Sequence, residues 1–345
     1  MTLAVERYTG DGAAWDAFGR TRRGWTHYHS HGWKAVLERT MRHEYVPLVA
    51  RETGDGTMAG ILPLVRVSTP LFGRYIVSMP FLNYGGPIGS DEAVRELARF
   101  AAAMADRERA KLLELRSAVE LPVDLPVSHR KITVVLPLPA GGDTEAAWKG
   151  LGTKLRAQVK RPQKEGVVVR FGADQVDPFF AVFARHMRDL GTPALPRAFF
   201  RAIAAEFGAE VWFGCAWLGD QPIAAGAGFR WGDEFEMTWA SALTEHSRIA
   251  PNMALYWAFI ERAVREGVGR FNFGRCTPGG GTHRFKRQWG ALDEPLWWYQ
   301  HVPGGGTAAT PSPDDSAYSW GPRIWKKLPL PLATALGPRI VRGIP

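Results

Sequence analysis

The chain has 345 residues, 46% of them hydrophobic and 12% aromatic, so it is long enough for two globular domains and too apolar to be disordered. A formal net charge of +9 favours anionic partners such as phosphorylated carriers, RNA or an anionic membrane face. Two cysteines exclude a disulfide framework, and no run of about eighteen apolar residues indicates a membrane span. Met1 to Arg23 lacks the apolar segment of a signal peptide, so we expect a cytoplasmic protein.

Apolar periodicity predicts alternating helices and strands in the first half of the chain. The predicted elements are a helix at 31–42, strands at 45–51 and 61–67 joined by a turn at 54–56, a helix at 91–108, and strands at 111–116 and 131–138. This order predicts an α/β fold with antiparallel hairpins rather than a regular parallel winding.

The second half repeats this order. Its predicted elements are a helix at 198–207, strands at 210–217, 223–230 and 234–240, a helix at 252–266 and a strand at 270–275. Val46, Gly54, Asp55 and Ala59 match Val211, Gly219, Asp220 and Ala224 at one constant offset, which indicates a repeated domain. We therefore expect domains at 1–142 and 143–302, a linker at 303–319 and a basic, apolar tail at 320–345.

Residues 270–290 combine a strand, a glycine-rich turn and a basic helical turn. Phe271 and Phe273 share one side of the strand, and Asn272 points to the other. Thr282 is the expected cap of a short helix that carries Phe285 and Trp289 on one face. Three cations, Arg284, Lys286 and Arg287, are left toward the edges of that helix.

This stretch resembles the pattern F-D-F-G-R-S…G…F-K-x-x-W-G of the FemA/FemB/FemX-like (FemAB) family, in particular the FemAB-type proteins found with exosortase (PEP-CTERM) exopolysaccharide systems. Further segments are similar to that family in the same order: 83–87, 154–164, 189–193, 251–252 and 255–257. The resemblance covers most of residues 30–302. Two positions differ, because the usual Asp is Asn272 and the usual Ser is Cys276.

The resemblance implies two tandem GNAT-like domains, with mixed, mostly antiparallel sheets flanked by helices, and an enzyme that transfers an aminoacyl or acyl group to an amine. It assigns Lys286 to the reaction centre, where a cation stabilises developing oxyanion charge. It also implies substrate contacts that we place at Arg156, Lys160, Lys164, Asn83, Tyr84, Asn252, Tyr256, Arg275 and Arg284. We expect no metal and no cofactor.

Several of these residues have a second interpretation. Arg156, Lys160 and Lys164 follow one another at four-residue steps and could grip phosphates or form a solvated helix face. Arg275 and Arg284 could clamp an anion or pair with Glu261, Asp293 or Glu294.

Other residues bear on the chemistry. Pro251 replaces a glycine of the loop that binds coenzyme A in GNAT acetyltransferases, and it removes one N–H. No general base stands out, since His283 alone is typical of polar surface. The histidines of the segment 27–31 would share a face of a strand but lack further metal ligands nearby, and Cys276 could be either a thiolate or a small packing residue.

We therefore expect a FemAB-like transferase that uses an activated donor, either aminoacyl-tRNA or an acyl carrier such as coenzyme A. Its acceptor would be a phosphorylated, lipid-linked amine of the cell envelope, including peptidoglycan or exopolysaccharide precursors. The alternatives are a coenzyme A-dependent GNAT N-acyltransferase and a basic RNA-binding or scaffold protein. The tail either contacts the inner face of an anionic membrane, with Trp325 at headgroup level, or packs on the first domain.

Overall fold

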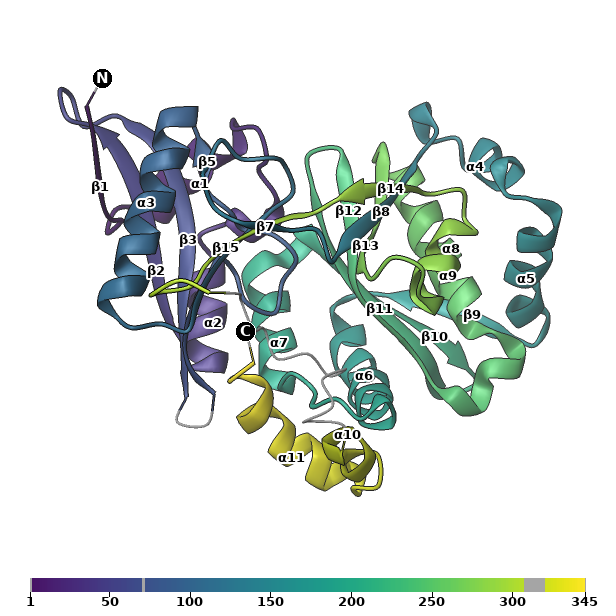
Figure 1. The fold of residues 1–345 in the computed structure, drawn as a ribbon. Helices are drawn as coiled ribbons and strands as arrows, with labels where there is room; N and C mark the ends of the chain where they lie inside the picture. The colour runs from purple at the N-terminus through teal and green to yellow at the C-terminus, as the bar shows by residue number, and fades with distance from the viewer. Residues whose placement is uncertain (1, 70–71, 307–319, 345) are drawn as a thin grey trace. The chain divides into compact units, whose positions relative to one another are not determined.

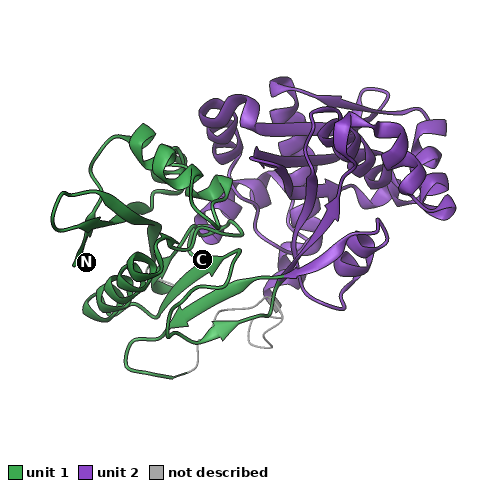
Figure 2. Ribbon diagram, turned by 90° about the horizontal axis from the view of Figure 1, so that it is seen from above, with its two compact units in different colours: residues 1–131, 295–312, 342–345 green, residues 132–294, 313–341 purple. Residues whose placement is uncertain are grey.

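The computed structural model describes residues 2–69, 72–306 and 320–344, and the chain divides into two compact units. Unit 1 contains residues 1–131, 295–312 and 342–345, and unit 2 contains residues 132–294 and 313–341 (Figure 2). Most of the expected linker, residues 307–319, lies outside the described residues.

Unit 1 is built on a sheet with the strand order β1-β2-β3-β4-β6-β15-β7, in which β5 pairs with β3 (Figure 1). Its strands are β1 (Leu3–Arg7), β2 (Glu44–Glu52), β3 (Met58–Thr69), β4 (Gly73–Val77), β5 (Ile88–Gly89), β6 (Leu112–Ser117), β7 (Val127–Ser128) and β15 (Trp297–His301). Its helices are α1 (Gly12–Arg20), the 3-10 helix η1 (His27–His29), α2 (Trp33–Met41) and α3 (Asp91–Arg107). Helix α3 begins where Ser90 Oγ accepts the Ala93 N–H, and its Ala and Leu face packs on the sheet.

Unit 2 is built on a sheet with the strand order β14-β8-β13-β12-β11-β10-β9. Its strands are β8 (Ile132–Pro137), β9 (Val167–Phe171), β10 (Val211–Leu218), β11 (Gln221–Trp231), β12 (Glu234–Ala242), β13 (Arg270–Cys276) and β14 (Leu292–Pro295). Its helices are α4 (Thr144–Gly150), α5 (Thr153–Lys164), α6 (Val176–Leu190), α7 (Arg197–Phe207), α8 (Pro251–Arg265) and α9 (Gly281–Arg287), with α10 (Trp320–Trp325) and α11 (Leu330–Val341) from the tail. Short 3-10 turns lie at Ala140–Gly142, Ala173–Gln175, Gly208–Glu210 and Thr244–Ile249.

The two units repeat one arrangement of strands. Strands β2 and β3 in unit 1, and β10 and β11 in unit 2, are antiparallel hairpins that turn at the matched Gly-Asp positions. Each unit also has one parallel pair, β4 with β6 and β12 with β13. The predicted α/β fold, with two mostly antiparallel sheets flanked by helices, is confirmed.

The units do not divide where the sequence suggested, near Gly142. Strand β8 was expected in the first domain, but it pairs with β13 in the sheet of unit 2. Residues 297–301 fell within the expected second domain, but they form β15, which pairs with β6 in the sheet of unit 1. The sequence predicts that residues 131–138 form a strand, whereas it does not show which distant strand they pair with.

The tail folds onto unit 2 as two short helices. Both α10 and α11 contact α6, and Arg188 on α6 donates to the Leu328 carbonyl at 3.0 Å. Trp325 is 9% exposed, so its expected place among lipid headgroups is wrong, because its indole is buried in protein. Residues 320–341 of the tail belong to unit 2, whereas its last residues, from Arg342, belong to unit 1. None of the helices within the described ranges is long and apolar enough to cross a membrane.

Candidate active site

The parallel strands β12 and β13 part in the middle of unit 2. They pair only through Glu234–Glu236 and Arg270–Asn272. Beyond these residues β12 continues along β11, whereas β13 continues along β8. The two strands therefore separate toward their carboxyl ends, and ligands of α/β sheets bind beyond the carboxyl ends of parallel strands.

A bulge in β13 shapes this point. The pairing of β13 with β8 shifts between Asn272 and Arg275, and Gly274 has φ +72°, which a side chain would disfavour. Asn272 holds the bulge because its Oδ1 accepts the Gly274 N–H at 2.8 Å and its Nδ2 donates to Glu234 Oε1 at 2.7 Å. An Asp could not donate to Glu234, so the Asn at this position fits its carboxylate neighbour.

Lys286 on α9 is anchored to this bulge. Its Nζ donates to the carbonyls of Gly274 at 2.6 Å and Arg275 at 2.9 Å, and the residue is 3% exposed. Burial lowers the pKa of Lys286 to about 8, while Cys276 and Glu236 act to raise it. The ammonium is therefore the main form at neutral pH, and of its three N–H groups two have acceptors among the described residues.

Glu236 was missed by the sequence reasoning. It lies on β12 opposite Asn272, is fully buried, and favours the charged form of Lys286. Its signal in the sequence was the alternation of Glu234 and Glu236 with Phe235, which is also typical of a solvated strand face. The burial of this carboxylate depends on the fold and not on local pattern.

An aromatic cluster lies beside Lys286. Tyr256 on α8 stacks on Phe273, with ring centroids 5.5 Å apart. The Tyr256 ring also contacts Phe285 edge-on, with centroids 4.9 Å apart, and is tilted against the Trp289 ring at 6.2 Å. Burial raises the pKa of Tyr256, so its phenol stays neutral. Phe285 and Trp289 therefore share a buried face as expected, but the cap of α9 is Gly280 and not Thr282.

The start of helix α8 offers few donors to an anion. Pro251 is its first residue and has no N–H, and the Met253 N–H donates to the Ala250 carbonyl at 2.9 Å. Ala250 has φ +53° and supplies no capping side chain, and Asn252 is half-buried. This geometry disfavours the pyrophosphate of coenzyme A, which needs several backbone N–H groups at a helix start.

The polar side chains around the glycine-rich turn form hydrogen bonds to the backbone of Gly279. Nδ1 of His283 accepts the Gly279 N–H at 3.0 Å, so Nε2 carries the proton and donates to Asp293 at 2.9 Å. Arg284 donates to the Gly279 carbonyl at 2.8 Å, and Arg275 is half-buried.

The carboxylates expected to pair with Arg275 and Arg284 have other partners. Glu294 pairs with Arg270 and Glu261 pairs with Arg265. Asp293 pairs with His283 and, at 3.7 Å, with Arg287.

Helix α5 carries the predicted basic run and continues through Pro162. Leu155, Val159 and Pro162 are buried, and α5 contacts α8. The cations point away from that contact: Arg156 donates to the Lys149 carbonyl at 3.3 Å, and Lys160 lies 5.6 Å from the Trp148 ring centre. Lys164 is exposed.

Asn83 and Tyr84 belong to unit 1, in a buried segment that follows β4. The Tyr84 ring is tilted against the Tyr28 ring, with centroids 5.8 Å apart, and Met79 and Phe81 in the same segment have positive φ values of 58° and 71°. Both predicted substrate residues lie in the core of unit 1, 4% and 2% exposed.

The histidines of segment 27–31 do not form a strand. His27 and His29 lie in the turn η1, where His29 Nε2 is 2.9 Å from the Gly86 carbonyl oxygen. Burial lowers the pKa of His29 to about 4, so the ring is neutral. The described part of the chain contains no group of three or more His, Cys, Asp or Glu arranged to hold a metal.

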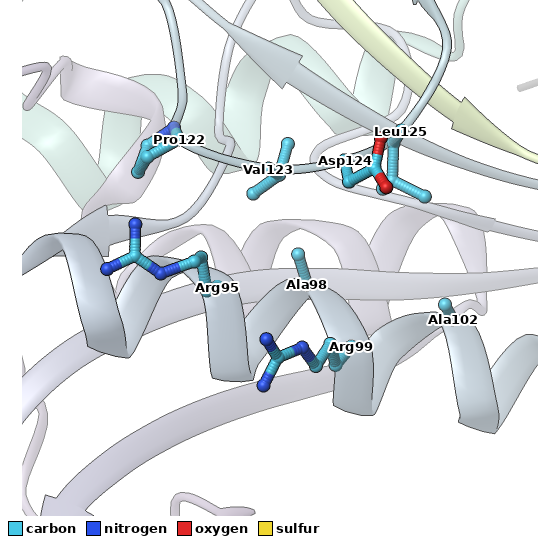
Figure 3. Close-up of a pocket in the computed structure, with 8 residues that line it drawn as sticks. All are labelled: Arg95, Ala98, Arg99, Ala102, Pro122, Val123, Asp124 and Leu125. Carbon is cyan, nitrogen blue, oxygen red and sulfur yellow. The ribbon is translucent and has the colours of Figure 1, made fainter.

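A pocket of about 340 Å³ lies in unit 1, between α3 and the segment 122–125 (Figure 3). Arg95 and Arg99 lie on its helix side and Asp124 on its loop side, over a floor that includes Ala98. None of the residues expected at the reaction centre lines it.

Residues 151–287 match the family model described as an acetyltransferase (GNAT) domain. No curated protein sequence matches the chain. Among solved structures, FemX is similar with a TM-score of 0.62 and 12% identity, over 85% of this chain and 97% of that one. A tandem GNAT protein from the clavulanic acid biosynthesis pathway has a TM-score of 0.53 and 12% identity, over 89% of this chain and 100% of that chain.

The C-terminal domain of a putative lysylphosphatidylglycerol synthetase from Agrobacterium fabrum has a TM-score of 0.54 and 12% identity, over 84% of this chain and 90% of that chain. At these identities the structural likeness shows the fold alone. Residues 151–287 are thus similar to a GNAT acetyltransferase domain, in a chain that has the fold of FemX and of a tandem GNAT protein.

Proposed function

We propose that this chain transfers an aminoacyl group from aminoacyl-tRNA to an amine of a cell-envelope or exopolysaccharide precursor. The observation that carries the proposal is the buried Lys286 ammonium at the point where β12 and β13 part. The GNAT domain match supports acyl transfer in general. The aminoacyl donor is supported by the resemblance to FemAB proteins, by the names of the structural neighbours, and by the donor-poor start of α8.

In the proposed reaction the acceptor amine attacks the carbonyl carbon of the aminoacyl ester. A C–N bond forms, negative charge develops on the carbonyl oxygen, and the remaining N–H of Lys286 stabilises it. The bond between the carbonyl carbon and the ribose oxygen then breaks, and the ribose oxygen leaves as a hydroxyl by taking up the proton that the acceptor amine has lost. Glu236 is our candidate for the base that takes the amine proton, since its carboxylate is buried beside Lys286.

The phosphorylated part of the acceptor is assigned to α5. Changing Arg156, Lys160 and Lys164 together to glutamine is expected to raise the KM for the acceptor about tenfold or more with little change in kcat, because phosphate contacts remote from the reacting atoms add uniform binding. Steady-state kinetics measure this. The matched control is the double variant Lys154→Gln and Arg161→Gln on the same helix, which should leave KM nearly unchanged. An unaltered KM in the triple variant would remove α5 from the site.

The proposal is tested by supplying two donors to the purified chain. In one reaction the donor is total aminoacyl-tRNA that carries labelled amino acids, and in a second reaction it is labelled acetyl-CoA. Each donor is incubated with the purified chain and a small-molecule cell extract, and labelled amides are identified by mass spectrometry. We expect amides only from aminoacyl-tRNA, and about 100-fold or more slowly with Lys286→Met. Label transferred from acetyl-CoA would favour the coenzyme A-dependent alternative. Absence of transfer from both donors would favour the non-enzymatic one.

A further inference from the structure

The folded tail presents an apolar surface to solvent. Leu332 and Leu336, one helical turn apart on α11, are 52% and 40% exposed, whereas Ala333 and Gly337 face inward. Ile324 on α10 and Leu190 at the end of α6 are also more than half exposed. These four residues, which we call the tail patch, make up most of the exposed large hydrophobic side chains among the described residues.

The elements that carry the tail patch are held together. Helices α10 and α11 lie beside α6 (Figure 1). Gly191 closely approaches Pro322, and Gly337 approaches both Ala194 and the Trp325 ring, so neither glycine could carry a side chain without a shift. The tail patch is therefore part of a packed structure and not of a loose arm.

Four exposed cations lie on or next to α10 and α11, and Asp189, the acidic neighbour of Leu190, is paired with Arg188. Arg323, Lys326, Lys327 and Arg339 are exposed, and none of them has an acidic partner in the part of the chain that the structure describes. The sequence from residue 320 to residue 345 contains no Asp or Glu. Exposed leucines beside several unpaired cations are typical of a surface that docks on an anionic membrane.

We propose that the tail patch docks unit 2 on an anionic phospholipid surface, without crossing it. A second copy of the chain fits less well, because a symmetric contact would bring the same four cations together. A nucleic acid would use the cations but not the leucines. This inference is independent of the proposed transfer reaction, since none of its residues belongs to the candidate active site.

The test is sedimentation of the full-length protein with vesicles. At low salt we expect binding to vesicles of phosphatidylcholine and phosphatidylglycerol in equal amounts, and little binding to phosphatidylcholine alone. Replacing Lys326 and Lys327 by glutamine should weaken binding about fivefold for each cation removed. Replacing Leu332 and Leu336 by serine should weaken it by about tenfold or more, through loss of apolar burial.

Two control variants carry matched changes elsewhere. The double variant Arg23→Gln and Arg130→Gln removes the same charge from exposed positions of unit 1, and Leu292→Ser removes an exposed leucine of β14. Both should bind vesicles like the unaltered protein. The proposal is overturned if the unaltered protein ignores the anionic vesicles, or if the tail-patch and control variants bind equally. It is also overturned if the leucine changes instead convert a dimer into a monomer in sedimentation velocity.

Discussion

Lys286→Met is expected to lower kcat by about 10²- to 10³-fold, the usual loss when one donor to a developing oxyanion is removed. Methionine keeps the length of the side chain but removes all three N–H groups. The measurement is the single-turnover rate of amide formation with the donor identified above. An unchanged rate would show that Lys286 only fastens α9 to β13.

This variant is also expected to be less stable, because the carbonyls of Gly274 and Arg275 lose their shared donor. Each buried carbonyl left without a partner costs about 1–3 kcal/mol of unfolding free energy. Rates should therefore be compared well below the melting temperature of the variant. Arg287→Met is the matched control, since it removes an exposed cation from the same helix and should retain kcat.

Arg116→Met is expected to lower the unfolding free energy by about 3–5 kcal/mol, because it leaves a buried carboxylate without its counter-ion. Arg116 Nε donates to Glu114 Oε1 at 2.8 Å, and both side chains are at most 3% exposed. Arg116 also donates to the Leu82 carbonyl at 3.1 Å and lies 4.6 Å from the Trp298 ring centre. The cation thus holds the buried segment that contains Asn83 and Tyr84.

Urea unfolding measures this effect, and Arg7→Met provides the comparison. Arg7 pairs with Glu44 at the same 2.8 Å, but that pair is nearly half exposed, so its loss should cost no more than about 1 kcal/mol. Equal losses in the two variants would contradict the importance assigned to the buried pair.

The local structure of this chain could be predicted well from its sequence. Helix α3 and the hairpin of β10 and β11 appear within two residues of their expected bounds, because periodicity and turn residues act over short distances. Helix α5 continues through Pro162, a residue that usually interrupts a helix interior. Lys286 was located through family resemblance and not through its surroundings.

Features that depend on distant partners could not be predicted. The exchange of β8 and β15 between units, the burial of Glu236 and the packing of Trp325 all require knowledge of which surfaces meet. Arg116 and Glu114 are two residues apart on β6, a spacing that in an exposed strand would give only a weak surface pair. In each case the same residue pattern fits both a solvated and a buried environment.

The pH dependence of kcat/KM tests most directly whether Lys286 acts as a cation. Burial lowers the pKa of Lys286 from 10.5 to about 8. In the pH range where the acceptor amine is already deprotonated, kcat/KM should therefore fall as the pH rises through about 8, because Lys286 loses its charge. The same depressed pKa makes the folded chain more stable as the pH rises toward 10.5, so this single titration cannot explain the fall through unfolding. Lys286→Arg, which keeps its charge, should lose this falling limb. A kcat/KM that is flat or still rising above pH of about 8 would contradict the cationic role of Lys286 and with it the proposed site.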